Sequence, residues 1–353
     1  MLAFLSRKIQ QAWYRPLGWN QIFLPLSWAF ERLAKRRRGQ FINGQRAVTR
    51  VSVPVIVVGN VSVGGTGKSP LVIYLIDALR RQGWQPGVVS RGYGASVQNF
   101  PCQVTAADEP ANKGDEPVMI VRRTDVPLVI DPDRGRAADY LLAKHCCDVI
   151  ISDDGLQHYA LARDIEIAVV DGQKGLGNGY CLPVGPLREP PSRLNEVDMI
   201  VLNQAEGGNP LANYNVDAEK MFSMAIVADG IYPLACLKGS DSSPIKAERL
   251  NGKVHGVAGI GNPDRFFSSL RQQGLEVIEH RFADHYQYQC HDLQFGDGLP
   301  VVMTEKDAVK CIRFELENCH YLKVSSQVEE TMMTLLMDLL TQVKSSLEAS
   351  AES

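Results

Sequence analysis

The sequence lacks the features that would mark several large classes of protein. None of its apolar stretches reaches the roughly 20 predominantly apolar residues that cross a bilayer, which excludes a multi-span membrane protein. Its eight cysteines form no C-x-x-C pair and no regular spacing, so we expect neither a disulfide framework nor a zinc site. Internal repeats and long low-complexity tracts are also missing. With 45% hydrophobic and 22% charged residues over 353 positions, the composition is that of an ordinary globular protein of about two domains. We expect the cysteines to be reduced, mostly buried thiols in a cytosolic compartment.

Charge is unevenly distributed along the chain, although the net charge is only −3. Residues 1–76 carry eleven Lys and Arg against one acid, whereas the remainder carries 26 bases against 39 acids. A basic front end on an acidic body predicts contact with an anionic surface, either a membrane or a nucleic acid. Because no nucleic-acid-reading motif accompanies the basic segment, we expect no nucleic-acid partner.

Residues 1–40 have the pattern of an amphipathic segment that lies on a membrane. The stretch 17–30 is mostly apolar, and its dense bases follow it at 32–38, which is not the order of a signal peptide. Three of the four tryptophans lie in this segment, at Trp13, Trp19 and Trp28. Tryptophan favours the headgroup layer and clustered bases favour anionic lipid. We therefore expect a helix on the cytoplasmic face of a membrane; the alternative is a terminal helix packed on the protein's own core.

Short β-branched runs alternate with helical stretches through most of the chain. Continuous apolar runs of this length are typical of strands buried on both faces of a parallel sheet with crossover helices. The first set of expected strands is 53–58, 87–90, 127–131, 149–152, 165–170 and 199–202. The second set is 253–258, 275–278, 300–304 and 321–324, with helices at 263–273 and 329–343. Residues 203–215 are rich in Asn, Gly and Pro, which predicts a linker between the two sets.

The first expected strand runs directly into a glycine-rich sequence and then an apolar helical run, the context that a P-loop requires. Backbone N–H groups of such a loop face phosphate oxygens, its lysine reaches the β- and γ-phosphates, and the next hydroxyl binds Mg²⁺. The match is imperfect, because Ser62 stands where G-x-x-x-x-G-K-[ST] has its first glycine. The predicted nucleotide-binding residues are Ser62, Val63, Gly64, Gly65, Thr66, Gly67, Lys68 and Ser69.

Further polar residues follow the other expected strands. Two carboxylates, Asp153 and Asp154, end the strand 149–152 and are candidates for positioning a metal ion. A plain Asp-Gly turn is the alternative. Ligands of open α/β sheets bind outside the carboxyl ends of the strands, so the loops that follow other strands share this edge. Candidates there for contacts with phosphate or substrate are Arg91, Arg134, His158 and Arg188, although each could also be an ordinary surface or structural residue.

Seven motifs occur in the order VGNVSVGGTGKSP, VVSRGYG, GDEP, SDDGLQHYALARDIEI, GPLREP, ADHY and MTEKDAVK. Together they resemble the tetraacyldisaccharide 4′-kinases, the lipid A 4′-kinases of Gram-negative bacteria, from about residue 15 to about residue 325. The resemblance implies transfer of the γ-phosphoryl group of ATP, with Mg²⁺, to the 4′-hydroxyl of a tetraacyldisaccharide 1-phosphate, giving lipid IVA. It also implies a monotopic enzyme on the cytoplasmic face of the bacterial inner membrane. Its partner is then an acylated disaccharide lipid, with no obligate protein partner.

The resemblance also implies roles for individual residues. Asp115 corresponds to the catalytic carboxylate, and His285, from a second domain, corresponds to its partner. A sugar hydroxyl does not ionise at neutral pH, so a positioned base has to take its proton as the new bond forms. The acids that the resemblance implies on the metal side are Asp153, Asp154 and Glu189, beside the Ser69 hydroxyl already expected from the P-loop pattern, and Arg134 and His158 match other active-site positions of the family. The implied fold is a P-loop α/β/α domain hinged to a smaller α/β domain by a two-stranded linker.

We therefore expect an α/β fold, namely a P-loop NTPase-like α/β/α sandwich with a mostly parallel sheet. A smaller C-terminal α/β domain and an N-terminal membrane-associating helix accompany it. The expected division is a membrane-associating segment at 1–40, the kinase domain at 41–212, a linker region at 213–250, the smaller domain at 251–345 and a disordered tail at 346–353. The roles of Glu116, Gln157 and Thr304–Asp307 stay open.

The main alternative function is a membrane-associated P-loop switch ATPase or GTPase that recruits protein partners. Guanine recognition usually uses [NT]-K-x-D, and in residues 304–307 the lysine comes one place too late. Membrane-cycling ATPases of the deviant type have K-G-G-x-G-K-[ST], whereas Val63 stands at the first position here. Dependence of ATP turnover on an acylated sugar acceptor separates the two functions.

Overall fold

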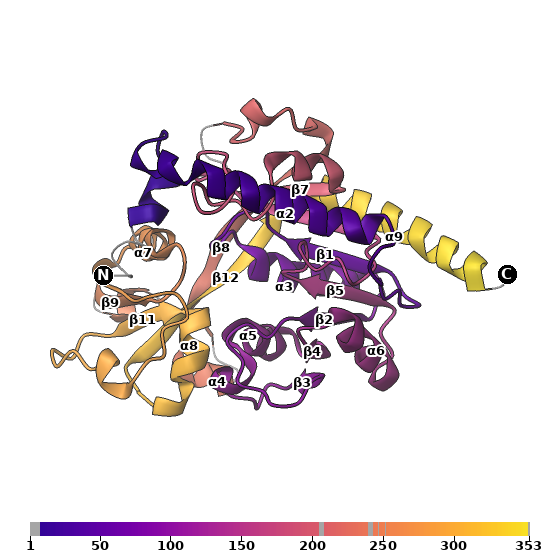
Figure 1. The fold of residues 1–353 in the computed structure, drawn as a ribbon. Helices are drawn as coiled ribbons and strands as arrows, with labels where there is room; N and C mark the ends of the chain where they lie inside the picture. The colour runs from indigo at the N-terminus through magenta and orange to yellow at the C-terminus, as the bar shows by residue number, and fades with distance from the viewer. Residues whose placement is uncertain (1–7, 205–207, 239–242, 246, 251, 352–353) are drawn as a thin grey trace.

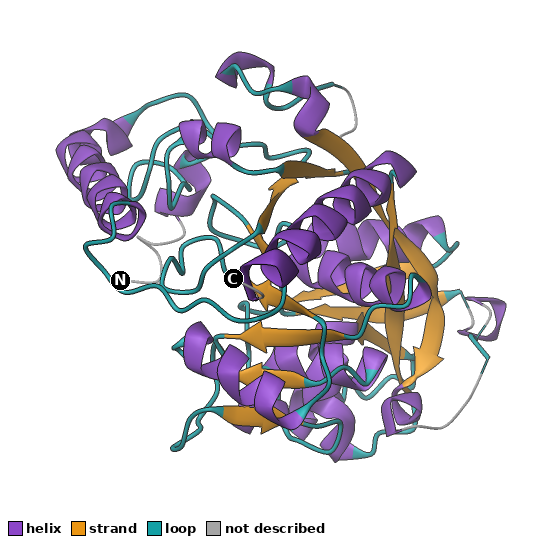
Figure 2. Ribbon diagram, turned by 90° about the vertical axis from the view of Figure 1, so that its right-hand side faces the viewer, coloured by secondary structure: helices purple, strands orange, loops and turns teal. Residues whose placement is uncertain are grey.

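The structure is a computed structural model that describes residues 8–204, 208–238, 243–245, 247–250 and 252–351. Over these residues, twelve strands form one sheet in the order β10-β9-β11-β12-β8-β7-β6-β1-β5-β2-β4-β3. The pairs β3–β4 and β8–β12 are antiparallel and the other neighbours are parallel. Helices cover both faces of the sheet (Figures 1 and 2). The expected α/β fold class is confirmed.

The half of the sheet that carries the glycine-rich loop has the buried strands that the sequence predicts. Its strands are β1 (Val55–Gly59), β2 (Pro86–Ser90), β3 (Cys102–Val104), β4 (Leu128–Ile130), β5 (Val149–Asp153), β6 (Ile165–Asp171) and β7 (Met199–Asn203). Its helices are α3 (Lys68–Arg81), α4 (Pro110–Lys113), α5 (Asp115–Thr124) and α6 (Arg134–Lys144). One face of this half packs against α3 and α5, and the other packs against α6 and the segment 176–211.

The remaining strands continue the same sheet into the C-terminal part. They are β8 (Met221–Pro233), β9 (Lys253–Ala258), β10 (Glu276–Arg281), β11 (Val301–Thr304) and β12 (Cys319–Val328). The helices are α7 (Pro263–Gln272), α8 (Glu305–Cys311) and α9 (Glu330–Ala351). Because β8 pairs with both β7 and β12, this antiparallel pair joins the two parts of the sheet.

The structure differs from the sequence-based expectations at three places. Strands β3 and β8 were not expected, and β8 lies within the expected linker region 213–250. Residues 346–351, expected in a tail, continue α9, because no Gly or Pro interrupts this run of helix-forming residues. Residues 352–353 lie outside the described residues. Helix α9 also buries Met332, Leu336 and Leu340 in the core shared with α3 and α5, although it was assigned to the smaller domain. The domain boundaries stay a prediction.

The N-terminal segment buries two polar side chains and exposes several large apolar ones. Its residues 8–12 are helical, and a 3₁₀ helix, η1 (Trp19–Phe23), and α2 (Leu24–Ile42) follow. Trp13, one of the three tryptophans expected at the headgroup layer, instead packs on the protein: it is 8% exposed, and its Nε1 donates to Pro183 O at 3.0 Å. Asn20 Nδ2 donates to Val184 O at 2.9 Å and Ser27 Oγ donates to Cys181 O at 2.7 Å. Five large apolar side chains are 47–72% exposed, namely Trp19, Ile22, Leu26, Trp28 and Leu33. No helix in the described part of the chain is both long and apolar enough to cross a bilayer, and residues 1–7 of the expected membrane segment lie outside that part.

Candidate active site

The glycine-rich sequence forms the turn between β1 and α3. Strand β1 ends at Gly59, and Lys68 is the first residue of α3. Gly64 and Gly67 have φ angles of 116° and 97°, which side-chain-bearing residues rarely adopt. The loop therefore has the strand–turn–helix geometry in which backbone N–H groups at a helix start bind phosphate.

The side-chain amides of two asparagines form hydrogen bonds that fix the conformation of this loop. Asn60 Nδ2 lies 3.3 Å from both Gly64 O and Thr66 Oγ1. The fully buried Asn203, at the end of β7, donates through Nδ2 to Thr66 O at 2.9 Å. The sequence analysis did not identify either asparagine, because its P-loop pattern covers only the loop itself.

We predict that Gly67→Ala will weaken nucleotide binding at least tenfold. A Cβ atom at this position would lie 2.4 Å from Asn203 Nδ2, so the loop would have to move away from the asparagine that fixes it. A matched control is Gly83→Ala, because Gly83 also has a positive φ, 88°, but no heavy atom within 4 Å of the added Cβ. Both variants should lose about 1–3 kcal/mol of stability in thermal unfolding, and only Gly67→Ala should lose affinity for an ATP analogue. Equal loss of affinity in both variants would contradict the prediction.

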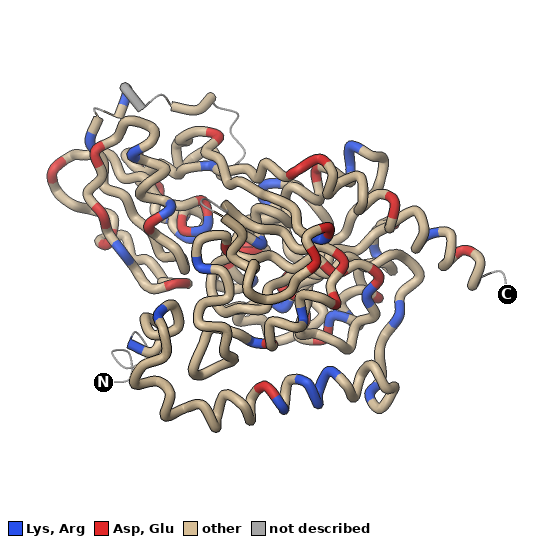
Figure 3. Tube along the Cα trace, turned by 90° about the horizontal axis from the view of Figure 1, so that it is seen from above, with Lys and Arg blue, Asp and Glu red and all other residues tan. Residues whose placement is uncertain are grey.

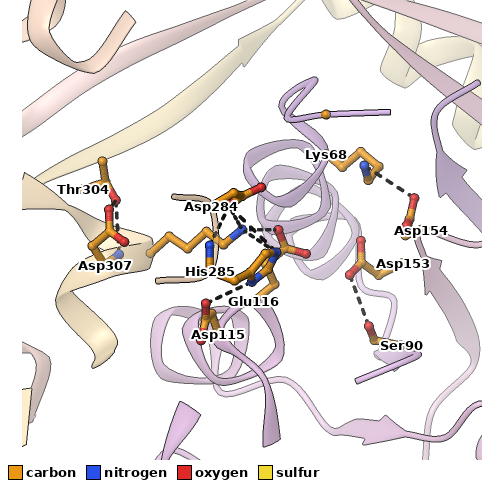
Figure 4. Close-up of polar contacts among 12 residues, drawn as sticks. Lys68, Ser90, Asp115, Glu116, Asp153, Asp154, Asp284, His285, Thr304 and Asp307 are labelled. Atoms are coloured by element: carbon orange, nitrogen blue, oxygen red, sulfur yellow. Dashed lines mark hydrogen bonds and ion pairs between the residues drawn. The ribbon is translucent and has the colours of Figure 1, made fainter. Parts of the chain in front are cut away.

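The first carboxylate after β5, Asp153, lies beside the phosphate loop. Strand β5 is the parallel neighbour of β1, with Asp153 opposite Val58. Asp153 is 2% exposed, and its Oδ2 accepts from Ser90 Oγ at 3.3 Å (Figure 4). Its Oδ1 has no hydrogen-bonding partner in the described part of the chain. Burial, together with the nearby Glu116 and Asp154, raises the pKa of Asp153 to about 7, so this carboxyl group needs a cation to be stably ionised.

The second carboxylate, Asp154, contacts the lysine of the loop directly. Lys68 Nζ lies 3.4 Å from Asp154 Oδ1 (Figure 4). Arg188 Nη1 lies 3.2 Å from Asp154 Oδ2. Burial alone would raise the pKa of Asp154, but the charges of Lys68 and Arg188 hold it below its ordinary value. Asp154 also has a φ of 47°, a strained conformation for a non-glycine residue that is common at functional sites.

The residues predicted on the metal side fit an ion carried by a nucleotide better than a metal cage built by the protein alone. Among the residues that the structure describes, no three His, Cys, Asp or Glu side chains gather in a metal-binding arrangement. Mg²⁺ usually keeps several waters and binds one or two carboxylates plus substrate phosphates. The unpartnered oxygen of Asp153 fits such an ion. The carboxylate of Glu189 is less available to a metal ion, because its two oxygens already accept hydrogen bonds from Tyr159 Oη and Gln157 Nε2.

The basic candidates take up different positions. Arg134 is buried and donates to the carbonyl groups of Asp153 and Asp154 at 3.4 and 3.3 Å, so it supports the acidic turn. His158 Nε2 accepts from the Arg134 backbone N–H at 3.3 Å. Burial and the charge of Arg134 lower the pKa of His158 to about 4, which keeps this imidazole neutral. The other two basic candidates, Arg91 and Arg188, line the cavity described below.

Asp115 and His285 contact each other although 170 positions separate them. Asp115 is the first residue of α5 and is 4% exposed, and its Oδ2 lies 3.1 Å from His285 Nδ1 (Figure 4). His285 follows β10 and has a φ of 61°, a left-handed conformation that the surrounding structure has to enforce. The two residues of the expected pair therefore come from different parts of the fold: Asp115 from the part that carries the glycine-rich loop, and His285 from the C-terminal part. Its catalytic role stays a prediction.

Two lysines of α8 flank this pair, and the sequence analysis assigned a role to neither. Lys310 Nζ lies 3.6 Å from Asp115 Oδ2 and 2.8 Å from Asp307 Oδ1. Lys306 Nζ lies 3.1 Å from Glu116 Oε1. The motif MTEKDAVK belongs to the family resemblance, but no property of the sequence alone indicates that its lysines meet Asp115 and Glu116.

One cavity extends from Glu116, His285 and the acids after β5 to the N-terminal helix α2. It has a volume of about 490 Å³. One side is lined by Phe30, Leu33, Ala34 and Arg37 of α2. The other side is lined by residues that include Arg91, Asp153, Asp154, Arg188, Glu189 and His285. An apolar wall therefore faces the acidic and basic groups at the sheet edge.

The fold is that of a P-loop kinase, in which the glycine-rich loop and the acids after β5 lie at the carboxyl ends of the neighbouring parallel strands β1 and β5. Comparison with known proteins makes the assignment specific. A family model described as tetraacyldisaccharide-1-P 4′-kinase matches residues 19–341. The chain belongs to this family, which confirms the resemblance found in the motifs.

Individual relatives match along nearly their whole length. The tetraacyldisaccharide 4′-kinase of Nitrosococcus oceani is 45% identical over 339 residues, which are 96% of this chain and 95% of that protein. The enzyme of the same name from Alcanivorax borkumensis is 46% identical over 95% of this chain and 97% of its own. A crystal structure of LpxK from Aquifex aeolicus, described as a complex with ATP, matches with a TM-score of 0.77 and 27% identity. It covers 92% of this chain and 100% of that chain. These matches do not favour the alternative of a switch ATPase or GTPase.

Proposed function

We propose that this protein transfers the γ-phosphoryl group of ATP to the 4′-hydroxyl of a tetraacyldisaccharide 1-phosphate, forming lipid IVA in lipid A biosynthesis. The observation that carries the proposal is the shared cavity. Its walls bring together the acids beside the phosphate loop, the His285 partner of Asp115 and an apolar face of α2. A soluble sugar kinase would have no need for the apolar wall.

The proposed mechanism uses the two sides of the cavity for the two substrates. The loop amides and Lys68 hold the phosphates of ATP, and Ser69 and Asp153 would hold Mg²⁺, which neutralises charge on the transferred group. Asp115 accepts the proton of the sugar hydroxyl as the oxygen attacks phosphorus. His285 orients the carboxylate through Oδ2, which leaves Oδ1 free, since no described residue hydrogen-bonds to it.

The acceptor is proposed to enter from the side of α2. Phe30, Leu33 and Ala34 offer apolar contacts to the first part of the acyl chains. Arg37 and Arg91 line the same cavity and offer charge to the anionic headgroup. The reacting hydroxyl would then approach Asp115 past His285.

The distribution of side chains around α2 supports association with the cytoplasmic face of the inner membrane. An ordinary surface helix buries its apolar face, whereas this segment turns Asn20 and Ser27 inward and Ile22, Leu26 and Trp28 outward. The bases at 32–38 follow on the same helix, along one edge of the molecule (Figure 3). Exposed apolar side chains beside clustered bases suit the boundary between acyl chains and anionic headgroups.

We predict that the triple variant Ile22→Ser/Leu26→Ser/Trp28→Ser will bind vesicles containing anionic phospholipid at least tenfold more weakly than the wild type. Each substitution removes an apolar side chain worth roughly 1.5–3 kcal/mol when fully buried. Flotation of the protein with vesicles measures the partition. Val48→Ser is the control, because Val48 is 41% exposed but lies outside η1 and α2. Activity on a detergent-dispersed acceptor should change less than twofold, and unchanged flotation would refute the membrane contact.

The function itself is tested by incubating the protein with ATP, Mg²⁺ and a tetraacyldisaccharide 1-phosphate, followed by mass spectrometry of the lipid. The expected product carries one additional phosphoryl group at the 4′ position. ATP hydrolysis without the acceptor should be slow. A rapid ATP turnover that is the same with and without the lipid acceptor, with no phosphorylated lipid formed, would instead favour the switch ATPase.

A further inference from the structure

Lys306 occupies a central place between the two parts of the site. It lies in the first turn of α8, and its side chain is 15% exposed. Its Nζ is 3.1 Å from Glu116 Oε1, 3.3 Å from Asp284 Oδ1 and 3.4 Å from His285 Nε2. Although burial opposes its charge, Glu116 and Asp284 hold the pKa of Lys306 above its ordinary value. The ammonium group is therefore charged and has fixed partners on α5 and on the loop after β10.

The contact with His285 determines which ring nitrogen carries the proton. An ammonium group has three donors and no acceptor, so the Nε2 atom that faces it has to present its lone pair. The single proton of the neutral ring then lies on Nδ1. This nitrogen faces Asp115 Oδ2 at 3.1 Å, where it donates a hydrogen bond to the carboxylate.

We propose that Lys306 is a positioning residue for phosphoryl transfer, which holds His285 as the neutral tautomer that donates through Nδ1 to Asp115. The inference rests on the proposed function, because it assigns Lys306 to the same acid–base pair. Lys306 does not touch the reacting atoms in this arrangement. It acts through His285, much as a carboxylate fixes the tautomer of a histidine in other enzymes.

The groups around Lys306 and His285 explain why a cation is needed there. Asp115 of α5 and Asp284 of the same loop lie 3.1 and 3.8 Å from the ring nitrogens of His285, and Glu116 of α5 lies 3.1 Å from Lys306 Nζ. Lys310 of α8 also contacts Asp115, and the Tyr93 ring, 5.1 Å from the His285 ring, adds no charge. Without Lys306, Glu116 and Asp284 lose their counter-charge, and His285 Nε2 loses the donor that faces it. The tautomer with its proton on Nε2, toward Asp284, then becomes available, and in that tautomer Nδ1 no longer donates to Asp115.

The test compares Lys306→Met with the wild type. Met has a similar length but no charge. We expect kcat to fall about 10- to 100-fold and the KM values for ATP and acceptor to stay within about threefold. Lys306→Arg should recover most of kcat, because a guanidinium group also only donates. Lys323→Met, which removes a charge from β12 away from the cavity, should match the wild type.

A second readout does not depend on turnover. In ¹⁵N spectra of histidine-labelled protein, with the signal assigned through His285→Gln, the wild type should show the Nδ1-protonated neutral form. Lys306→Met should show a mixture of the two tautomers at the same pH. A wild-type kcat and ¹⁵N spectrum in Lys306→Met would overturn the inference. Absence of lipid phosphorylation by the wild type would overturn the proposed function instead, so the two failures are distinguishable.

Discussion

We expect Asp115→Asn to lower kcat by about two to four orders of magnitude and to change the KM for ATP by less than about threefold. Asparagine has nearly the same shape as aspartate but cannot accept the proton of the sugar hydroxyl. In the described part of the chain, the hydrogen-bond and ion-pair partners of the Asp115 side chain are His285 and Lys310, neither of which belongs to the glycine-rich loop. Nucleotide binding should therefore be unaffected. Initial rates at saturating acceptor, together with calorimetric titration of an ATP analogue, measure the two quantities.

The partner of this residue is tested by a double-mutant cycle. His285→Gln alone should lower kcat, and the combination with Asp115→Asn should lose little more than Asp115→Asn alone, since His285 acts through the carboxylate. Asp264→Asn is the control, because Asp264 is an exposed carboxylate whose ion-pair partner is Arg281. Near-normal turnover in Asp115→Asn would remove Asp115 as the base. Fully additive losses would mean that the two side chains act separately.

The parts of the site whose position in the fold follows from the sequence are local ones. The loop from Ser62 to Ser69 and the acids after β5 depend on a strand, a turn and a helix start that are contiguous in the chain, and buried parallel strands give a strong apolar signal. Their arrangement at one edge follows from the parallel order of β1 and β5. By contrast, Asp115 and His285 are 170 positions apart, and only the family resemblance brought them together before the structure did.

The missed features are those that depend on tertiary contacts. Strand β8 contains Asp229 and Gly230, and its pairing with β12 shifts register at Lys323/Val324, so its period-2 alternation is broken. Lys306 and Lys310 stand in an ordinary amphipathic pattern that gives no indication of buried ion pairs. The inward polar groups of the N-terminal segment, such as Asn20, are recognisable only once the segment 180–189 is folded against them.

Lys68→Met is expected to lower kcat/KM for ATP by about 10²- to 10³-fold and to weaken binding of an ATP analogue. The ammonium group is the only charged group of the loop sequence from Ser62 to Ser69, and methionine removes it at nearly constant length. The fold should remain intact, because Asp154 keeps its contact with Arg188 at 3.2 Å. Thermal unfolding checks that assumption.

The comparison between the two variants separates their roles. Loss of Lys68 should reduce affinity for the nucleotide and kcat together, whereas loss of Asp115 should reduce kcat alone, because only Lys68 contacts the phosphates before the reaction begins. Lys144→Met, at the exposed end of α6, is the charge-matched control and should behave as the wild type. Lys68→Arg should recover little activity, since a planar guanidinium group is larger and cannot replace a compact ammonium group within the loop. If the analogue binds Lys68→Met as tightly as the wild type, the loop does not hold the phosphates in the way that its geometry indicates.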